Sequence, residues 1–488
     1  MSGLVRIANC KFKIVNLQFT IFLLLLLIAT AAASRAAERP NVLFIYSDDQ
    51  RADTIAALGN QHIRTPNLDR LVAEGTVMRR AYCMGALQGA VCVPSRAMLL
   101  TGRTLFRATS NMEDQRTWPE QFAAAGYTTF ISGKWHTQAA SLVRAFDRGK
   151  AVFLGGMGEP YSLPVQDFGP DDKLVNKRLS TKHSVELFTD CAVEFIEQQP
   201  NDKPFLAYVP LNLPHDPRLA PPEYHERYNA AKPPLPANYL PQHPFNNGSM
   251  VGRDEELAPW PRTPDVVRQH LADYYSAIEF VDAQVGRILN ALETSGQYER
   301  TIIVFAGDHG LAIGSHGLFG KQNLYEHSMR APLILAGPGI PRGKSSDALC
   351  YLLDIFPSLG KLAGVSPPEG SEGKSLIPVL QGKVPSHRDS IFTAYTKVQR
   401  AMTDGRWKLL VFPRINKMQL FDLQNDPHEM NDLAGDAAHR STVLRLTTLL
   451  KQSQEQYGDK QPLTTDKPLP LEFDFSKVKR KALSPQRD

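Results

Sequence analysis

Residues 41–49 read NVLFIYSDD, a short apolar run that ends in two adjacent carboxylates. Three further apolar runs follow, at residues 128–131, 205–209 and 301–306, and helical stretches separate them. Short apolar runs that alternate with helices are typical of an α/β domain with a largely parallel sheet. We therefore predict an α/β fold: a large domain with a mostly parallel central sheet flanked by helices.

Polar side chains of chemically useful types follow each of the four runs. In open α/β sheets, ligands bind at the carboxyl ends of the strands. Polar residues end most strands, so a single case is weak evidence, whereas four in succession favour a site. The residues are Asp48 and Asp49, then Lys134 and His136, then His215, and finally Asp308 and His309.

The chain divides into four predicted parts. Residues 1–33 are a signal peptide, 38–375 a catalytic domain, 383–470 a smaller C-terminal α+β domain, and 471–488 a basic tail. The C-terminal domain is predicted from short antiparallel strands near residues 390–395, 401–402, 407–412 and 419–421, with a helix near 441–457.

The signal peptide is predicted from Arg6, Lys11 and Lys13, which precede an apolar run at residues 19–28, and from the alanines at 31–33. An uncleaved anchor is the alternative, but the run is short for a span of about 20 residues. We expect export to a periplasm or outer medium, or to a lysosome or secretory lumen in a eukaryote, and no stable membrane span in the mature form.

Charge and cysteine content argue against a nucleic-acid-binding protein and against a disulfide-rich protein. Arg6, Lys11, Lys13 and Arg35 supply four of the five net positive charges, so the chain from Glu38 onward carries +1. This balance indicates no nucleic-acid partner. Five scattered cysteines are too few for a disulfide framework.

Residues 92–103 read CVPSRAMLLTGR. Pro94 suits the first turn of a helix and Gly102 its end, which places Cys92 at the positive N-terminus. That position, with Arg96 one turn on, predicts a lowered thiol pKa and a nucleophile or anion site. A buried cysteine before a capped helix is the alternative.

This stretch resembles the signature C-x-P-S-R-x-x-x-L-T-G-R of the formylglycine-dependent sulfatases, in the alkaline phosphatase superfamily. The resemblance implies an alkaline-phosphatase-like fold. It also implies that a formylglycine-generating enzyme converts Cys92 to Cα-formylglycine. The hydrated aldehyde would attack the sulfur of a sulfate ester, with Arg96 beside it.

The resemblance extends over nearly all the mature chain and implies a metal site at Asp48, Asp49, Cys92, Asp308 and His309. Carboxylates around one point repel one another unless a cation is present, and their hard oxygens favour Ca²⁺, with Mg²⁺ possible. Many relatives have Asn where His309 stands, which leaves the identity of the ion open.

Three further motifs supply catalytic candidates by resemblance. Lys134 and His136 lie in G-K-W-H, His215 in P-H-x-P, and Lys321 in K-x-x-x-Y-E-x-x-x-R. The lysines would bind sulfate, His136 would contact the formylglycine, and His215 would lie near the leaving oxygen. Singly, each could be a solvated lysine or a loop histidine.

The sequence thus predicts a sulfuric ester hydrolase that acts on a sulfated small molecule or glycan. A sulfated carbohydrate is the expected substrate, with choline sulfate and aryl sulfates open. Loops at residues 144–177 and 224–262 would contact the alcohol. Two alternatives remain: a phosphodiesterase or phosphonate monoester hydrolase of the same superfamily, and a binding protein for sulfated glycans.

Overall fold

The computed structural model describes residues 39–478. The predicted signal peptide and the end of the basic tail lie outside the described residues. The prediction of cleavage and export therefore stays a prediction.

A mixed sheet of ten strands organises the large domain, in the order β13-β2-β12-β10-β1-β9-β5-β6-β7-β8. Its centre consists of the four predicted strands: β10 (Thr301–Gly307), β1 (Asn41–Ser47), β9 (Phe205–Pro210) and β5 (Thr128–Lys134). These four are neighbours and run parallel. The predicted parallel centre is therefore confirmed, and the carboxyl ends of all four strands meet at one edge.

The outer strands make the sheet mixed. On one side lie β12 (Leu333–Ala336), β2 (Gly75–Met78) and β13 (Lys344–Ser346), with β12 antiparallel to both β10 and β2. On the other lie β6 (Arg148–Phe153), β7 (Pro164–Phe168) and β8 (Leu174–Leu179), with β7 antiparallel to its neighbours. Part of the segment at residues 144–177, expected as a loop that contacts the alcohol, thus extends the sheet.

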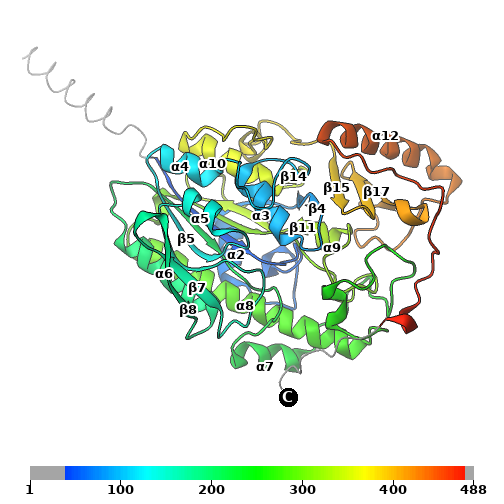
Figure 1. The fold of residues 1–488 in the computed structure, drawn as a ribbon, viewed down its shortest axis with the longest axis horizontal. Coiled ribbons are helices and arrows are strands. Elements are labelled where there is room, and N and C mark those ends of the chain that lie inside the picture. Colours follow the sequence, from blue (N-terminus) through cyan, green and yellow to red (C-terminus); the bar gives the residue numbers. More distant parts are fainter. Residues whose placement is uncertain (1–38, 479–488) are drawn as a thin grey trace, which may run out of the picture. The chain divides into compact units, whose positions relative to one another are not determined.

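Both faces of the central strands are covered. In β1, Val42, Phe44 and Tyr46 belong to one core cluster, and Leu43 and Ile45 belong to another. Successive side chains of a strand point to opposite faces of the sheet. A strand that is apolar throughout is therefore stable only if other elements pack on both faces. Figure 1 shows helices above and below the sheet. The Phe44 face packs on α3 (Cys92–Thr101), α4 (Trp118–Ala124), α5 (Ala139–Ala145) and α10 (Ile355–Ala363), and the Ile45 face on α2 (Pro66–Glu74), α6 (Ser184–Gln198) and α8 (Pro264–Thr294).

Local sequence signals mark the ends of the helices. α2 starts at Pro66 and stops before Gly75. α4 begins after Thr117, whose side chain forms a capping box with Glu120. α8 begins after Thr263, whose side chain accepts from the Val266 N–H, and α7 (Pro222–Ala231) packs against it.

The C-terminal region has the predicted antiparallel sheet: β15 (Ile391–Tyr395), β16 (Gln399–Thr403), β17 (Trp407–Phe412) and β18 (Lys417–Asp422). Helix α12 (Arg440–Tyr457) packs on β16 and β17. A fifth strand, β4 (Gly85–Ala86), comes from the catalytic region and pairs in parallel with β15. The two parts of the chain therefore share a sheet.

Short elements complete the fold. A three-stranded sheet contains β11 (Arg330–Ala331), β3 (Ala81–Tyr82) and β14 (Cys350–Tyr351). Two one-turn helices are α9 (Glu326–Met329) and α11 (Ile377–Leu380). Within residues 39–478, no helix has both the length and the apolarity for a membrane span. The four cysteines of this range are unpaired and buried.

Candidate active site

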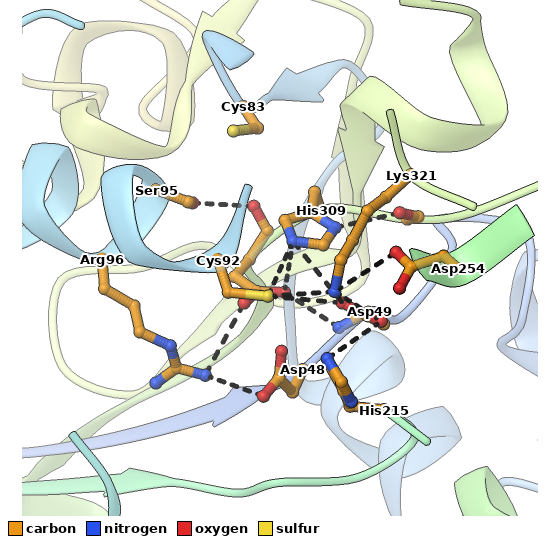
Figure 2. Close-up of polar contacts among 12 residues, drawn as sticks. Asp48, Asp49, Cys83, Cys92, Ser95, Arg96, His215, Asp254, His309 and Lys321 are labelled. Carbon is orange, nitrogen blue, oxygen red and sulfur yellow. Dashed lines mark hydrogen bonds and ion pairs between the residues drawn. The ribbon is translucent and has the colours of Figure 1, made fainter. Parts of the chain in front are cut away.

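The site lies where the carboxyl edge of the sheet meets the start of α3 (Figure 2). Asp48 and Asp49 follow β1, and Asp308 and His309 follow the neighbouring strand β10. Cys92 is the first residue of α3. All five side chains are buried. Strand order therefore brings together acids that are about 260 residues apart in the chain.

Cys92 contacts three of the predicted site residues. Its Sγ lies 3.2 Å from His309 Nε2 and 3.2 Å from Lys321 Nζ, and 3.6 Å from Asp49 Oδ1. Figure 2 shows the thiol pointing toward these groups, away from the α3 axis. The side chain at position 92 therefore faces a cluster of polar and charged side chains.

The prediction of a lowered thiol pKa for Cys92 is wrong. Burial, followed by the nearby Asp48 carboxylate, raises the pKa of Cys92 well above its ordinary value, and Lys321 only partly offsets this. The helix N-terminus is where it was expected, but Arg96 points away and donates from Nη1 to the Lys134 carbonyl at 3.0 Å. Desolvation and carboxylates outweigh the helix dipole here.

The backbone around the carboxylates is held firmly. The Asp49 N–H donates to Asp308 Oδ1 at 2.9 Å, and Tyr274 Oη donates to the Asp49 carbonyl at 2.6 Å. Asp49 has a positive φ of 65°, an uncommon conformation for a residue with a side chain. Ser95 Oγ donates to the Asp308 carbonyl at 2.8 Å. The turns after β1 and β10 are therefore locked to each other, to α8 and to α3.

Three cations surround the carboxylates. Arg96 Nη2 lies 3.5 Å from Asp48 Oδ2 and 3.6 Å from Asp308 Oδ2. The Lys134 ammonium contacts Asp48, and Lys321 Nζ lies 2.8 and 2.9 Å from the Asp49 oxygens. All three cations are buried. Burial alone would raise the pKa of Asp48 and Asp49, but cationic neighbours outweigh it and hold both pKa values below the ordinary range.

The two predicted catalytic histidines are placed differently. His215 Nε2 lies 3.8 Å from Asp49 Oδ2, and its Nδ1 lies 2.8 Å from the Asp216 carbonyl oxygen. His136 follows Lys134 in a positive-φ turn, and no hydrogen bond links its ring to Cys92 within the described residues. Burial, with Lys134 nearby, lowers the pKa of His136 to about 2. The structure brings His215 into the cluster more directly than His136.

The donor set fits a divalent cation. Ligand atoms of Asp49, Cys92, Asp308 and His309 lie within 4.8 Å of one another, as do those of Asp48, Asp49, Cys92 and His215. Asp48 Oδ1 and Asp308 Oδ2 are buried without a hydrogen-bond partner. His309 Nδ1 lies 2.9 Å from the Gly310 carbonyl oxygen, which assigns the proton to Nδ1 and leaves the Nε2 lone pair toward the site.

The sequence did not predict the role of two adjacent acids, Asp254 and Glu255, which contact the segment that carries Lys321. Asp254 Oδ2 lies 4.0 Å from Lys321 Nζ and accepts from Gln322 Nε2 at 2.8 Å. Glu255 accepts from the Phe319 and Gly320 N–H groups and pairs with Arg262. These residues fix the segment that carries Lys321. They lie in the 224–262 region, where only contacts with the alcohol were expected.

Comparison with known proteins identifies the family and agrees with the fold. The family model described as Sulfatase matches residues 40–365, and the model described as N-sulphoglucosamine sulphohydrolase, C-terminal, matches residues 314–456. The N-acetylglucosamine-6-O-sulfatase of Bacteroides thetaiotaomicron is 30% identical, over 87% of this chain and 88% of that protein.

Solved structures agree as well. A protein in complex with its substrate D-glucosamine-2-N,6-O-disulfate superposes with a TM-score of 0.73 at 27% identity, covering 87% of this chain and 99% of that one. The phosphonate monoester hydrolase of Agrobacterium radiobacter shares the fold, with a TM-score of 0.70 at 21% identity over 86% and 96% of the two chains.

The fold and the site define a hydrolase of the alkaline phosphatase superfamily. More narrowly, the chain belongs to the sulfatase family, and the protein is a sulfatase. The family and fold predicted from the sequence are thereby confirmed.

Proposed function

We propose that this sulfatase releases inorganic sulfate from a sulfated carbohydrate, with residue 92 as Cα-formylglycine beside a divalent cation. One observation carries the proposal. The side chain of residue 92 points at Asp49, His309 and Lys321 across 3.2 to 3.6 Å, inside a buried ring of acids and cations. A nucleophile in this position would reach a sulfate group held by the same cations.

The chain's own residues have distinct tasks in this proposal. Asp48, Asp49, Asp308 and His309 would hold the cation, with the residue 92 oxygen completing the set. Ca²⁺ or Mg²⁺ would there supply a fixed positive charge to the sulfate and the nucleophile. Residue 92 as the hydrated aldehyde would supply a hard oxygen nucleophile whose second hydroxyl permits release of sulfate.

Arg96, Lys134 and Lys321 would neutralise the sulfate oxygens. Their charges are buried, where an electrostatic contact is stronger than in water. The Asp49 carboxylate, whose Oδ1 lies 3.6 Å from the residue 92 sulfur, would accept the proton of the attacking hydroxyl. His215 would protonate the departing oxygen, and His136 would take a proton as sulfate leaves.

A sulfated amino sugar is the first substrate to test. A 30% identical relative is named N-acetylglucosamine-6-O-sulfatase, and a structural relative is described with D-glucosamine-2-N,6-O-disulfate as its substrate. We propose the 6-O-sulfate of a glucosamine unit, to be compared with choline sulfate, an aryl sulfate and a matched phosphate ester. Faster cleavage of the phosphate ester would favour the phosphodiesterase alternative.

The nucleophile is tested by Cys92→Ala in protein coexpressed with a formylglycine-generating enzyme. Sulfate release should fall to background, because alanine at position 92 supplies no nucleophile. The circular dichroism spectrum should stay unchanged, because the fold is retained. Cys191→Ala is the matched control, since Cys191 is a buried thiol on the core-facing side of α6, outside the site. In wild-type protein, the peptide that spans residue 92 should have the mass of the aldehyde form, which is lighter than the thiol form. Sulfate release by Cys92→Ala at the wild-type rate would refute the assignment.

The cation is tested by removal and by Asp308→Ala. Dialysis against a chelator should abolish activity, and Ca²⁺ or Mg²⁺ should restore it. Asp308→Ala should lower the bound divalent metal measured by mass spectrometry to below about a tenth of one equivalent, because buried carboxylates dominate such a site. Asp265→Ala, at an exposed aspartate of α8, should keep the metal. Full activity in metal-free protein would exclude the proposed role.

We also infer export, as the N-terminal basic residues and apolar run indicate. The first residue of protein purified from the native host should lie soon after the alanines at 31–33. An intact N-terminus on the mature protein would contradict cleavage.

A further inference from the structure

A groove in the C-terminal region lies outside the site described above. Its volume is about 450 Å³, within the range typical of ligand pockets. It is bounded by the turn between β15 and β16, by the turn between β17 and β18, and by the segment at residues 461–469 that follows α12. The lining residues are Lys397, Pro413, Arg414, Gln461, Pro462, Thr464, Thr465, Lys467 and Leu469.

The groove concentrates positive charge. Lys397, Arg414 and Lys467 line it, and the lining contains no carboxylate. All three cations are exposed, and in the part of the chain that the structure describes none of them forms an ion pair. The chain from Glu38 onward carries a net charge of only +1, so this cluster is a local feature.

The walls are fixed by buried and reciprocal contacts. Arg400 pairs with Asp459 at 2.6 and 2.9 Å, both side chains being buried, and also donates to the Thr396 carbonyl at 2.7 Å. Asn416 and Thr465 exchange two hydrogen bonds of 2.8 Å. The Leu469 N–H donates to the Arg414 carbonyl at 2.8 Å. The three cations are therefore presented by a preformed scaffold.

The groove is connected to the segment that bears Lys321. Lys397 lies in the turn between β15 and β16, whose Gln399 donates from Nε2 to the Gln322 carbonyl at 3.3 Å. The Thr396 N–H donates to the Ala86 carbonyl at 2.6 Å, in the strand six residues before Cys92. One wall of the groove thus packs directly on two segments that supply active-site residues.

We propose that this groove binds the sulfated chain of an oligosaccharide or polysaccharide at sugar units away from the ester being cleaved. The three cations would pair with sulfate groups. Thr464, Thr465 and Gln461 offer hydrogen bonds to hydroxyls, and Pro413 and Leu469 offer apolar surface to a sugar ring. The inference extends the proposed function, because it assumes that the substrate is a sulfated glycan.

The test compares a triple variant, K397A/R414A/K467A, with a control triple, K203A/K344A/K361A. The control removes three exposed lysines that lie outside the groove, so both variants have the same net charge. Binding of a size-defined heparin dodecasaccharide is measured by fluorescence anisotropy on Cys92→Ala protein. Steady-state kinetics are measured on the active forms with that oligosaccharide and with N-acetylglucosamine-6-sulfate.

The groove variant should bind the dodecasaccharide about tenfold more weakly than the control, since three exposed ion pairs are lost. The difference should shrink in high salt, because such pairs are screened. The KM for the dodecasaccharide should rise while the kinetics on the monosaccharide stay unchanged. Equal binding by the two triples would overturn the proposal. Tighter capture of a single-stranded DNA of equal charge than of the sulfated chain would also overturn it.

If the proposed function is wrong, the result differs from the one expected if only the groove proposal is wrong. In that case neither sulfated sugar is hydrolysed by wild-type protein, whereas the binding comparison on Cys92→Ala protein still decides the groove.

Discussion

At the scale of single residues, Asp49 is the point where the charges of the site meet. Its carboxylate lies 2.8 and 2.9 Å from Lys321, 3.5 Å from His309 and 3.8 Å from His215. Its backbone is held by Asp308 and Tyr274. One side chain therefore touches a proposed sulfate ligand, a proposed metal ligand and the proposed general acid. Changes at the neighbours are more informative than a change at Asp49 itself, which would disturb all three.

His215 allows a test that separates proton donation from binding. In His215→Ala, kcat/KM for a sugar sulfate should fall by about 100-fold or more, because an alkoxide leaves poorly without a proton. For 4-nitrophenyl sulfate the loss should stay below about tenfold, because the phenolate leaves unaided. Both rates are measured by sulfate or phenol release.

The control for this comparison is His225→Ala. His225 lies on α7 and pairs with Asp273, outside the site. It should leave both rates within about twofold. Equal losses for the two substrates in His215→Ala would argue that His215 positions the substrate and donates no proton in the slow step.

At the scale of elements, the pairing of β4 with β15 connects the two sheets. Gly85 has a positive φ of 103°, and a Cβ built there would lie 2.0 Å from the Ala394 carbonyl oxygen. Only glycine permits this approach of two backbones. The pairing sets the path of the segment that leads to Cys92, so an element of two residues affects the position of the nucleophile.

Gly85→Ala should therefore destabilise the protein and reduce its activity together. Strain at a positive φ costs about 1–3 kcal/mol, and the clash with Ala394 adds to it. We expect a lower thermal unfolding midpoint by several degrees, measured by calorimetry, and a lower kcat. Gly89→Ala is the control, since a Cβ there meets nothing within 4 Å. A Gly85→Ala protein as stable as Gly89→Ala would show that β4 can move without cost.

At the scale of the whole molecule, Asp354 joins the catalytic region to the start of the C-terminal sheet. It is fully buried and accepts hydrogen bonds from the Lys374 N–H at 2.7 Å, from Arg388 Nε at 2.7 Å and from the Tyr351 N–H at 2.9 Å. Burial would raise its pKa, but the hydrogen bonds from Arg388 and His387 outweigh it and lower the pKa of Asp354 to about 2.

This shift predicts a pH-dependent stability. A carboxyl whose pKa is lower in the folded state stabilises the fold above its ordinary pKa, and the contribution is lost as the pH falls to about 2. Asp354→Asn should cost about 2 kcal/mol at pH 7. The difference in unfolding midpoint from wild type should shrink as the pH falls from about 4 toward about 2.

Differential scanning fluorimetry at a series of pH values measures this difference. Asp265→Asn is the control, because the Asp265 side chain is 98% exposed and should change little at any pH. A constant difference between Asp354→Asn and wild type down to about pH 2 would show that packing, and not ionisation, accounts for the loss.

The local sequence determined the central strands, several helix ends and the order of the site residues. An apolar run such as residues 41–46, or a Thr-Pro start such as Thr65-Pro66, acts through neighbouring residues and so leaves its mark in the sequence. Because parallel strands present their carboxyl ends at one edge, the sequence also predicts that Asp48, Asp49 and Asp308 lie close together. The signature around Cys92 identified the sulfatase family for the same reason, because it is contiguous.

Only the tertiary structure decided the features that depend on distant partners. The raised thiol pKa of Cys92 comes from burial and from Asp48 in another element, the fixing of the Lys321 segment comes from Glu255, and the cationic groove joins residues from 397 to 469. Desolvation and Coulomb interactions depend on distance through space, which sequence separation does not report. The sequence alone was therefore enough to predict the family and which of the proposed site residues lie together, while the electrostatics and the cationic groove of this protein required the fold.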